Sequence, residues 1–536
     1  MFNMKKIIQL LTTCREQLRR PRSLFAFSCI VSLATLLLYN LPFFHYVATH
    51  TNEDTLGRIF LVTSLVVLML AVNFLMTYLT LFLLRVVGRI LLAVLAVINA
   101  TAVYFIYTYS VIIDATTIEN VFNTRYSEAS GFFSGPLWIT ILAIGVLPAL
   151  YCLFRPVIYS TVRRFTVFSV TSLILIVLVS LVNINQTLFI SQHDTELGAL
   201  LQPWSYLVNT CRIASLCHDE QAEEIKLPDG RITDNRKAVV VLVIGESARK
   251  ANFQLYGYGR NTNPLLSRQK DLKVFHANAC ATYTTAGTKA ILEPKATDEL
   301  YEMLPNYAFR TGVDVSWRTS NWGEPPIHIS EYVTDDELSS RYPDADSRYD
   351  GILFAGLRKR IQSSTSPKVL IILHTSTSHG PNYSVKYPEQ FQVFKPVAKS
   401  VEEGQKNLPM LVNAYDNTIL YTDYLLSNLI DTLRSMTDWN SALFFVSDHG
   451  ESLGENNIFM HGLPMKLAPK VQYEIPFLVW TSPGFRNYKP TSRQSEPSDD
   501  TLPAVLDQHY VFHSVLNLLS VESPAYDKTH DIFKYK

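Results

Sequence analysis

The chain has 536 residues, of which 48% are hydrophobic and 18% are charged, with 47 basic and 47 acidic side chains. This length exceeds that of one ordinary domain, and this hydrophobic content excludes a disordered chain. Because the formal net charge is zero, a nucleic-acid-binding protein driven by a broad basic field is also excluded. The six cysteines match neither a paired Cys-x-x-Cys zinc site nor a dense disulfide scaffold. Any metal ion should therefore be held by carboxylates and histidines.

The first 187 residues contain five apolar runs, each long enough to cross the roughly 30 Å hydrocarbon core of a membrane as a helix. These runs cover approximately residues 24–46, 59–84, 90–112, 134–154 and 165–186. Buried helices of a soluble bundle would show polar faces at helical spacing, which a segment such as FLVTSLVVLMLAV lacks. The pattern therefore predicts a transmembrane domain with five helices over residues 1–187.

Lysine and arginine are unevenly distributed around these runs. They are concentrated in the leader before the first run, in the turn with Arg85 and Arg89, and in the turn with Arg155, Arg163 and Arg164. The intervening loops carry one arginine each. This asymmetry predicts a cytoplasmic amino terminus, and an odd number of spans places the remainder of the chain on the opposite side. The first run lacks a small-residue cleavage site, so we expect it to be a retained anchor.

Residues 188–237 form a connector whose stretch LGALLQPWSYLVNTCRIASL fits either a helix along the bilayer surface or a packed helix. From residue 238 to residue 536, short β-type runs alternate with helix-length segments. The clearest strand candidates cover residues 238–245, 368–374, 441–450 and 475–480. Such continuous apolar runs are typical of a largely parallel sheet covered on both faces. We therefore predict an α/β domain over residues 238–536, with its chemistry at the carboxyl ends of the strands.

Polar residues that could bind a metal ion follow these predicted strands directly. They are Glu246, His374, His379, Asp448, His449 and His461. One such residue would have an ordinary role as a cap or loop hydrogen-bond partner, but several at one edge of a sheet favour a site. Carboxylate oxygen and imidazole nitrogen together suit Zn²⁺ or a similar divalent cation, and a catalytic site keeps one coordination position open.

Four segments carry a resemblance to a known family. They are GESARKANFQLYGYGRNTNP at 245–264, HTSTSHGPNYSVKYP at 374–388, NAYDNTILYTD at 413–423 and SDHGESLGENNIFMHGLPMKLAP at 447–469. They resemble the signature segments of bacterial phosphoethanolamine transferases, members of the alkaline phosphatase and sulfatase superfamily that include the polymyxin (colistin) resistance enzymes acting on lipid A. The resemblance runs through nearly the whole chain. It implies five transmembrane helices, a connector and a periplasmic alkaline-phosphatase-like domain with a mostly parallel central sheet.

The nucleophile of this family is a metal-bound threonine. Aligning the segment ANACATYTTAGTKAILEP with the family places this threonine at Thr284, with Thr282 and Thr285 as rivals. A threonine-rich turn would by itself be only a hydrogen-bonded loop. The Ser-Val-Pro-Cys run that follows the threonine in the colistin-resistance members is absent, so Cys280 has no obvious local disulfide partner.

The resemblance also implies a bound zinc ion with four ligands, namely Glu246, Thr284, Asp448 and His449. Metal coordination lowers the pKa of a hydroxyl group, which activates a weak nucleophile at neutral pH. His379 and His461 match family histidines beside the transferring group, where an imidazole can hold phosphate oxygens or act as a general acid. His374 is expected to be structural. The lysine that some members place after a Trp-Arg pair has no equivalent after Trp317 and Arg318.

The loop between the third and fourth predicted spans contains Asn120, Thr124 and Glu128, which lie four residues apart and so on one face of a helix. Spacing alone also fits a solvated helix face. The same pattern resembles the family segment that receives the ethanolamine group of the donor, where Glu128 would pair with the ammonium. In the same oxidising compartment, Cys211 and Cys217 are candidates for a disulfide.

These features predict a ping-pong phosphoethanolamine transferase of the bacterial inner membrane. Thr284 would attack phosphatidylethanolamine and release diacylglycerol, and a phosphate or hydroxyl group of lipid A, the lipopolysaccharide core or another envelope glycan would then take the phosphoethanolamine group from threonine. We expect a monomer in contact with membrane lipids. Membrane tethering supplies both substrates at high local concentration.

Two alternatives belong to different classes. A membrane-anchored phosphoglycerol transferase, sulfatase or phosphodiesterase of the same superfamily would share the metal and threonine, but the loop between the third and fourth spans disfavours it. A non-catalytic module that senses envelope lipids is disfavoured because the carboxylate and histidine ligand candidates are all present.

Overall fold

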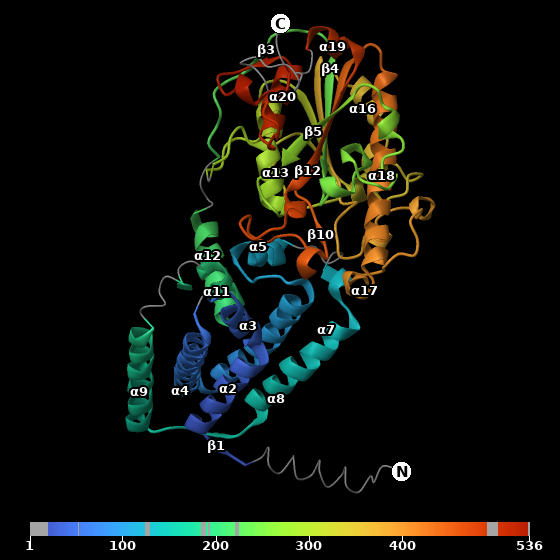
Figure 1. The fold of residues 1–536 in the computed structure, drawn as a ribbon. Coiled ribbons are helices and arrows are strands. Elements are labelled where there is room, and N and C mark those ends of the chain that lie inside the picture. Colours follow the sequence, from blue (N-terminus) through green and yellow to red (C-terminus); the bar gives the residue numbers. More distant parts are fainter. Residues whose placement is uncertain are drawn as a thin grey trace. The chain divides into compact units, whose positions relative to one another are not determined.

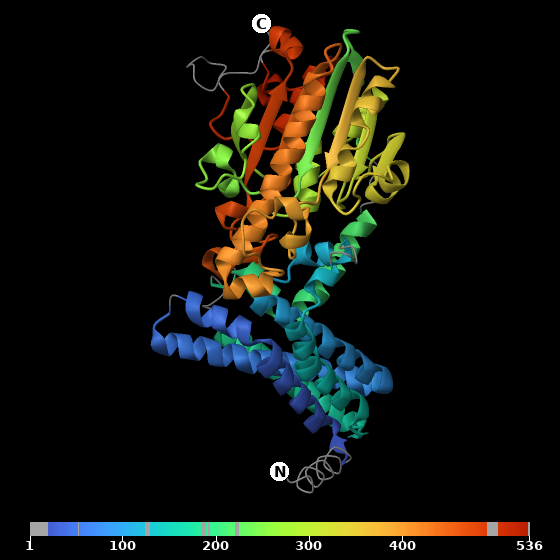
Figure 2. The same cartoon turned by 90° about the vertical axis from the view of Figure 1, so that its right-hand side faces the viewer.

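The computed structural model describes residues 20–51, 53–123, 129–183, 189–190, 193–219, 224–297, 299–489 and 502–533. Contacts within the chain define two compact units. The first, here called the helical unit, comprises Met1–Phe122 and Phe132–His218, and the second, the α/β unit, comprises Asn123–Gly131 and Asp219–Lys536. Figures 1 and 2 show the helices and strands of each unit in two views.

The helical unit consists mainly of helices (Figure 1). Its elements are β1 (Arg22–Ser23), α2 (Leu24–Tyr39), α3 (Leu41–His50), α4 (Thr55–Tyr109), α5 (Ala115–Asn123), α7 (Gly135–Thr140), α8 (Leu147–Phe154), β2 (Val157–Ile158), α9 (Val162–Val182), α11 (Asp194–Leu200) and α12 (Trp204–Asp219). A π-helical segment, Ile141–Val146, joins α7 to α8.

The apolar helical region expected from the sequence is present. In the part of the chain that the structure describes, three helices are long and apolar enough to cross a membrane: Thr55–Tyr109, Gly135–Phe154 and Val162–Val182. The pair formed by α2 and α3, bent by 59°, would be a fourth if it is one span. The structure thus has three or four candidate spans where the sequence predicts five, because the second and third predicted runs form the single helix α4.

The basic turns predicted between the spans lie together at one end of the helical unit. Arg85 is the non-helical residue inside α4, with φ 46° and ψ −106°. Arg89 donates hydrogen bonds to the carbonyl oxygens of Cys152 at 2.9 Å and Arg155 at 2.7 Å, so it satisfies carbonyls that the end of α8 leaves unpaired. At the same end, β1 pairs with β2 in parallel.

Helix α12, which lies in the predicted connector, packs against α4. In the first turns of α12, Trp204 Nε1 donates to Asn73 Oδ1 at 3.1 Å, and the Tyr206 hydroxyl donates to Asn99 Oδ1 at 3.0 Å. Both asparagines belong to α4 and are buried. Because each of these buried amide oxygens receives a donor, the two bonds tie α12 to α4.

The α/β unit alternates strands and helices. Its elements are β3 (Arg231–Ile232), β4 (Ala238–Gly245), β5 (Leu272–Asn278), α13 (Thr284–Leu292), α14 (Leu304–Arg310), β6 (Asp314–Thr319), β7 (Glu331–Thr334), α15 (Asp335–Arg341), α16 (Leu357–Gln362), β8 (Lys368–His374), α17 (Val401–Lys406), α18 (Leu408–Arg434), β9 (Asn440–Ser447), β10 (Ser452–Leu453), β11 (Phe459–Met460), β12 (Glu474–Thr481), α19 (Pro483–Tyr488), α20 (Tyr510–Leu518) and β13 (Val521–Glu522).

The central sheet has seven strands in the order β5-β12-β9-β4-β8-β6-β7. The pairs β9-β4, β4-β8, β8-β6 and β6-β7 are parallel, whereas β12 runs antiparallel to both β9 and β5. The sheet is therefore mostly parallel, as predicted. The apolar run in β12 resembles those in the parallel strands, so its pattern did not indicate the reversed direction.

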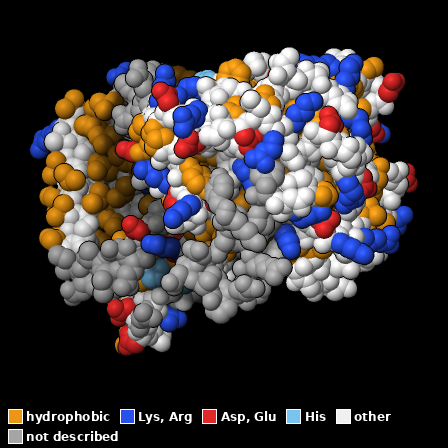
Figure 3. All heavy atoms as spheres, turned by 90° about the horizontal axis from the view of Figure 1, so that it is seen from above, with side chains coloured by type: hydrophobic (Ala, Val, Ile, Leu, Met, Phe, Trp, Pro, Cys, Tyr) orange, Lys and Arg blue, Asp and Glu red, His pale blue; other side chains and the backbone are white. Residues whose placement is uncertain are grey.

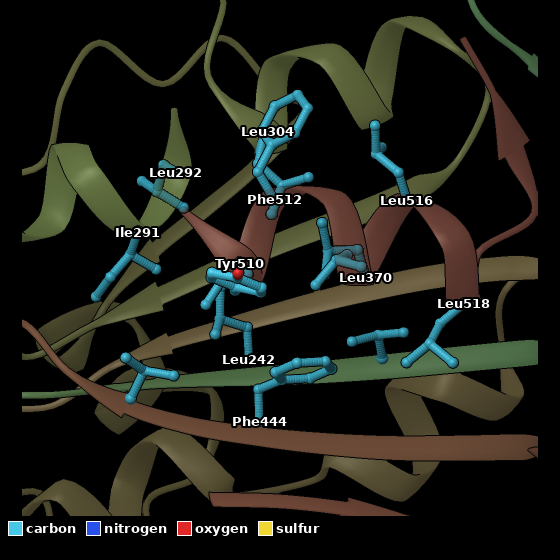
Figure 4. Packing of buried hydrophobic residues seen from close by; sticks show 14 of the residues in the cluster. Leu242, Ile291, Leu292, Leu304, Leu370, Phe444, Tyr510, Phe512, Leu516 and Leu518 are labelled. Atoms are coloured by element: carbon cyan, nitrogen blue, oxygen red, sulfur yellow. The ribbon is translucent and has the colours of Figure 1, made fainter. Parts of the chain in front are cut away.

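Helices cover both faces of this sheet (Figures 1 and 2). On one face, α13, α14 and α20 pack against the strands, and Figure 4 shows Leu242, Leu370 and Phe444 of the sheet beside Phe512 and Leu516 of α20. On the other face, α18 contacts β9. Every residue of β4 is buried, which explains why its sequence is a continuous apolar run rather than an alternating one.

Charged and hydrophobic side chains are unevenly distributed over the surface. On the face seen in Figure 3, acidic and basic side chains are interspersed over much of the molecule, and hydrophobic side chains gather toward one side. Helix α9, all of whose residues are described, buries only Ser172. A helix with such an apolar exposed surface suits a lipid environment, because hydrocarbon does not penalise it.

Candidate active site

The parallel register brings the acidic candidates side by side. Gly245, the last residue of β4, lies opposite Ser447, the last residue of β9, so Glu246 and Asp448 are the first residues after these adjacent strands. The same register pairs Ile244 with His374 at the end of β8. As the sequence predicts, the carboxyl ends of neighbouring strands form the site.

Thr284 is the first residue of α13 and points at the same edge. Its Oγ1 lies 3.4 Å from each carboxylate oxygen of Glu246 and 3.3 Å from Nε2 of His449. Gly287 permits this approach, because a Cβ atom there would lie 2.3 Å from the carbonyl oxygen of Asp448. The amino-terminal end of a helix favours negative charge, so this position suits an alkoxide or a phosphoryl oxygen.

The rival threonines have other surroundings. The hydroxyl of Thr282 donates to the carbonyl oxygen of Leu463 at 2.5 Å. The Thr285 hydroxyl is buried and has no hydrogen-bond partner among the described residues. Of the three candidates, Thr284 is the one whose hydroxyl group lies between Glu246 and His449.

The carboxylates and the imidazole of His449 form a compact cluster. His449 Nε2 lies 3.3 Å from Glu246 Oε1 and 3.4 Å from Asp448 Oδ2. On its other side, His449 Nδ1 lies 2.9 Å from the carbonyl oxygen of Gly450 and donates to it, which directs Nε2 at the carboxylates. Asp448 Oδ1 accepts the backbone N–H of Ser247 at 3.0 Å, but Asp448 Oδ2 is buried without a donor from any described residue.

The electrostatics of this cluster favour a bound cation. Burial opposes ionisation of Glu246, yet its contact with His449 holds the pKa of the carboxyl well below its usual range. Burial, reinforced by the Glu246 charge, raises the pKa of Asp448 to about 7. Burial disfavours the charged imidazole of His449, but Asp448 and Glu246 raise its pKa to about 10. Two buried carboxylates, one of them with its Oδ2 unpaired among the described residues, are thus arranged to receive a positive charge.

The ligand atoms also fit a metal ion geometrically. Two groups of three candidate ligand atoms each lie within 4.8 Å of one another: Glu246, His449 and His461, and Glu246, His374 and Asp448. Carboxylate and imidazole donors suit a borderline divalent ion such as Zn²⁺. The donor set therefore fits the metal-dependent chemistry that the sequence predicts.

Two further histidines flank the cluster. The His461 ring centre lies 4.2 Å from that of His449 and 5.3 Å from that of His379, and His379 Nε2 lies 3.9 Å from Glu246 Oε1. His461 Nδ1 lies 2.7 Å from Glu451 Oε2, so Glu451 orients the ring. Burial, with repulsion from His449, lowers the pKa of His461.

The residues that hold the cluster in place were not predicted from the sequence. Asn321 Nδ2 donates to Glu246 Oε2 at 2.6 Å and to the Thr375 carbonyl at 2.9 Å. His374 Nδ1 lies 3.0 Å from Glu324 Oε1, but His374 also belongs to one of the two candidate ligand groups, so its structural role stays a prediction. Asn321 follows β6 at the same sheet edge, so the rule that found Glu246 would also have found it had β6 been recognised as a strand.

Other predicted residues are only partly described. Asn120 lies in α5, whereas Thr124 and Glu128 lie outside the described residues. The side chain of Cys217 is also outside them, so its pairing with Cys211 stays a prediction. Cys280 forms no disulfide with a described residue, and its Sγ lies 3.7 Å from His509 Nδ1.

A mostly parallel sheet with carboxylates, histidines and a helix-terminal threonine at one edge defines a sulfatase-like enzyme domain, and the Sulfatase family matches residues 238–521. The family of phosphoethanolamine transferases EptA and EptB matches residues 68–216. Phosphoethanolamine transferase EptA of Helicobacter pylori is 34% identical over 96% of this chain and 98% of its own length. The chain therefore belongs to the phosphoethanolamine transferase family, as the sequence motifs indicate.

Two other comparisons agree with this assignment. Phosphatidylethanolamine transferase Mcr-1 of Escherichia coli is 30% identical over 86% of this chain and 90% of its own length. The solved structure of the integral membrane protein lipooligosaccharide phosphoethanolamine transferase A from Neisseria meningitidis matches with a TM-score of 0.85 at 25% identity, over 95% of this chain and 98% of that one. These matches confirm that the chain is a membrane-embedded transferase with a sulfatase-like domain.

Proposed function

We propose that this protein transfers phosphoethanolamine from phosphatidylethanolamine to lipid A, the lipopolysaccharide core or another envelope glycan through a covalent intermediate on Thr284. The observation that carries the proposal is the Thr284 hydroxyl at the start of α13, 3.4 Å from both oxygens of Glu246 and 3.3 Å from His449. The names of the Mcr-1 and Neisseria relatives support this donor and a lipooligosaccharide acceptor.

In the first step, Thr284 Oγ1 forms a bond to the donor phosphorus while the bond from phosphorus to the glycerol oxygen breaks. The threonine proton leaves to solvent, and the departing diacylglycerol oxygen takes a proton from an imidazolium at His379 rather than at His461, whose lowered pKa disfavours the charged ring. These rings lie beside the cluster, and Glu451 holds the orientation of His461. Proton donation to the leaving group matters because a glycerol alkoxide is a poor leaving group at neutral pH.

In the second step, an acceptor oxygen forms a bond to phosphorus while the bond from phosphorus to Thr284 Oγ1 breaks. The acceptor proton passes to the imidazole that was deprotonated in the first step, and the threonine oxygen regains a proton from solvent. The start of α13 stabilises negative charge on the phosphoryl oxygens in both steps. No atom is left over, so the protein returns to its starting state.

A divalent metal ion, proposed to be Zn²⁺, would be held by Glu246, Thr284, Asp448 and His449. When bound, it would lower the pKa of the threonine hydroxyl and balance phosphate charge. The support for this ligand set is the convergence of His449 Nε2 on both carboxylates and the unpaired Asp448 Oδ2.

Donor recognition is proposed for the loop with Asn120, Thr124 and Glu128, where the Glu128 carboxylate would pair with the ethanolamine ammonium. Other partners are membrane lipids, and we expect the protein to act as a monomer. Domain boundaries are proposed at residues 1–187, 188–237 and 238–536.

We also propose five spans with a cytoplasmic amino terminus and a periplasmic catalytic domain. Helix α4 has 55 residues, so at about 1.5 Å per residue it is about 82 Å long, far beyond a hydrocarbon core of roughly 30 Å. A double crossing with its turn at Arg85 accounts for this length. The basic turns collected at one end of the helical unit support a cytoplasmic location for that end.

The proposed reaction is tested with the full-length protein in vesicles that contain phosphatidylethanolamine and purified lipid A. Mass spectrometry should show diacylglycerol and lipid A heavier by one phosphoethanolamine group. Replacing the donor by phosphatidylglycerol should stop the reaction. Transfer of phosphoglycerol in that second experiment would favour the phosphoglycerol transferase alternative. Hydrolysis of an added aryl sulfate, without any transfer of phosphoethanolamine, would favour a sulfatase.

Asn321→Ala should weaken metal binding about 10–100-fold, because Asn321 orients the Glu246 carboxylate without binding the metal itself. Zinc affinity measured by competition with a fluorescent chelator checks this. Asn263→Ala, the same substitution at a buried residue outside the site, serves as the control for general destabilisation. Equal zinc affinity in the two variants would contradict the positioning role.

Reporter fusions test the path of α4. Alkaline phosphatase, which is active only in the periplasm, should be inactive when fused after Gly88 and active when fused after His50 or Asp219. The reason is that Arg85 would mark a cytoplasmic turn. Activity of the fusion after Gly88 would show that α4 does not return at this point and would overturn the five-span topology.

A further inference from the structure

A cavity of about 440 Å³ lies inside the helical unit, among α2, α4, α8 with its preceding π-helical segment, and the start of α12. Its volume falls within the range of roughly 300–1,000 Å³ that is typical of ligand pockets. The lining is mostly apolar with a few polar groups, which is also the usual composition of such pockets. We infer that this cavity binds one acyl chain of a membrane glycerophospholipid, with the ester group of that lipid held by Asn73 and Tyr151.

The exposed part of the lining indicates where the occupant comes from. Ile30, Met76 and Leu147 line the cavity and are 40%, 43% and 64% exposed. They belong to α2, α4 and α8, which are parts of the candidate membrane spans. Their exposed surface is therefore bathed by lipid tails, and a chain of the bilayer can enter between the helices without leaving hydrocarbon.

Two hydrogen-bond donors in the lining distinguish an acyl ester from a plain hydrocarbon. Asn73 is 5% exposed, and its Oδ1 accepts the Trp204 indole N–H at 3.1 Å, which orients the amide. Its Nδ2 and the Tyr151 hydroxyl are both buried without a hydrogen-bond partner among the described residues. An unpaired buried donor is destabilising, and an ester carbonyl oxygen can accept such a bond whereas a hydrocarbon cannot.

The charge of the lining decides between an uncharged ester and a charged group. Among the described residues that line the cavity, none is lysine, arginine or histidine. The carboxylate of a free fatty acid or the phosphate of a headgroup would therefore have no counter-charge inside and would be costly to bury. The ester and its chain can enter, and the charged headgroup stays outside.

The occupant would also contact the connector. Trp204 and Leu207 line the cavity and belong to the first turns of α12. A chain bound here would fill the space between α12 and the helices α2 and α4. Lipid binding in this cavity does not depend on any step of the proposed transfer reaction. The two proposals can therefore be tested separately.

The probe is a phosphatidylglycerol with a photoreactive diazirine in one acyl chain, which differs from the proposed donor. The full-length protein in phosphatidylethanolamine and phosphatidylglycerol vesicles is irradiated, and cross-linked residues are mapped by mass spectrometry. We expect cross-links at buried lining residues such as Thr77, which is 6% exposed, as well as on the lipid-facing side of α9. Ala96→Phe should fill the cavity, because Ala96 lines it, and should remove the Thr77 cross-links while those on α9 remain.

A second variant keeps the test independent of any packing defect from the larger side chain. Tyr151→Phe removes one hydroxyl group and should reduce the lipid that copurifies with the protein about fivefold, the effect of losing one hydrogen bond. Tyr107→Phe, at a tyrosine outside the lining, should change nothing. Cross-links confined to α9 in the unmodified protein, or equal lipid retention in both tyrosine variants, would overturn the proposal.

Discussion

Thr284→Ala is expected to abolish phosphoethanolamine transfer, with a loss of at least about three orders of magnitude, as for removal of other enzyme nucleophiles. The hydroxyl group that lies between Glu246 and His449 would be gone, and alanine offers no atom to attack phosphorus. Brief incubation of the unmodified enzyme with phosphatidylethanolamine and no acceptor should leave a phosphoethanolamine adduct on Thr284, detectable by peptide mass spectrometry. The variant should show neither adduct nor turnover.

The fold should survive this substitution. The Thr284 hydroxyl has long contacts of 3.3 and 3.4 Å, so its removal should change the free energy of unfolding by about 1 kcal/mol at most. Thr288→Ala is the matched control, because Thr288 is a buried threonine on the same helix outside the ligand set. An adduct on Thr285 would keep the mechanism and move the nucleophile, whereas full turnover by Thr284→Ala without any adduct would favour direct hydrolysis by water.

Asp448→Asn is expected to remove bound metal and most activity. The substitution preserves the size of the side chain, but it removes one negative charge from the cluster. It also replaces the carboxylate, whose Oδ2 has no hydrogen-bond donor among the described residues, by a neutral amide group. Zn²⁺ is bound mainly by thiolate, imidazole and carboxylate groups, and a neutral amide is a weaker ligand than a carboxylate, so affinity should fall steeply. Elemental analysis of the purified protein and activity after zinc addition measure the two effects.

The control for Asp448→Asn is a carboxylate of the same unit that lies outside the site. Asp423 accepts the backbone N–H groups of Leu265 at 3.0 Å and Leu266 at 2.9 Å, and burial raises its pKa to about 6. Asp423→Asn removes an equally buried charge, so metal content should stay unchanged even if stability shifts. Full metal content in Asp448→Asn would refute the proposed ligand set.

Several features of this protein follow from the sequence alone. The apolar runs before residue 187 are long enough for membrane helices, and the later runs such as AVVVLVIG are short enough for buried parallel strands. Glu246, Asp448 and His449 were therefore expected at one sheet edge, and the structure places them there because the carboxyl ends of adjacent parallel strands coincide. These inferences depend on residue types and periodicity within one short segment.

Other features were decided only by the tertiary structure. Three threonines lie within four residues, and which hydroxyl meets Glu246 and His449 depends on how closely α13 approaches the loop after β9, which Gly287 permits. Asn321 supports Glu246 from a strand end that the sequence reasoning did not recognise. The reversed direction of β12 and the packing of α12 on α4 likewise left no periodic signal. Local patterns record which face of a segment is buried, whereas a contact between distant segments depends on chain packing that no single segment encodes.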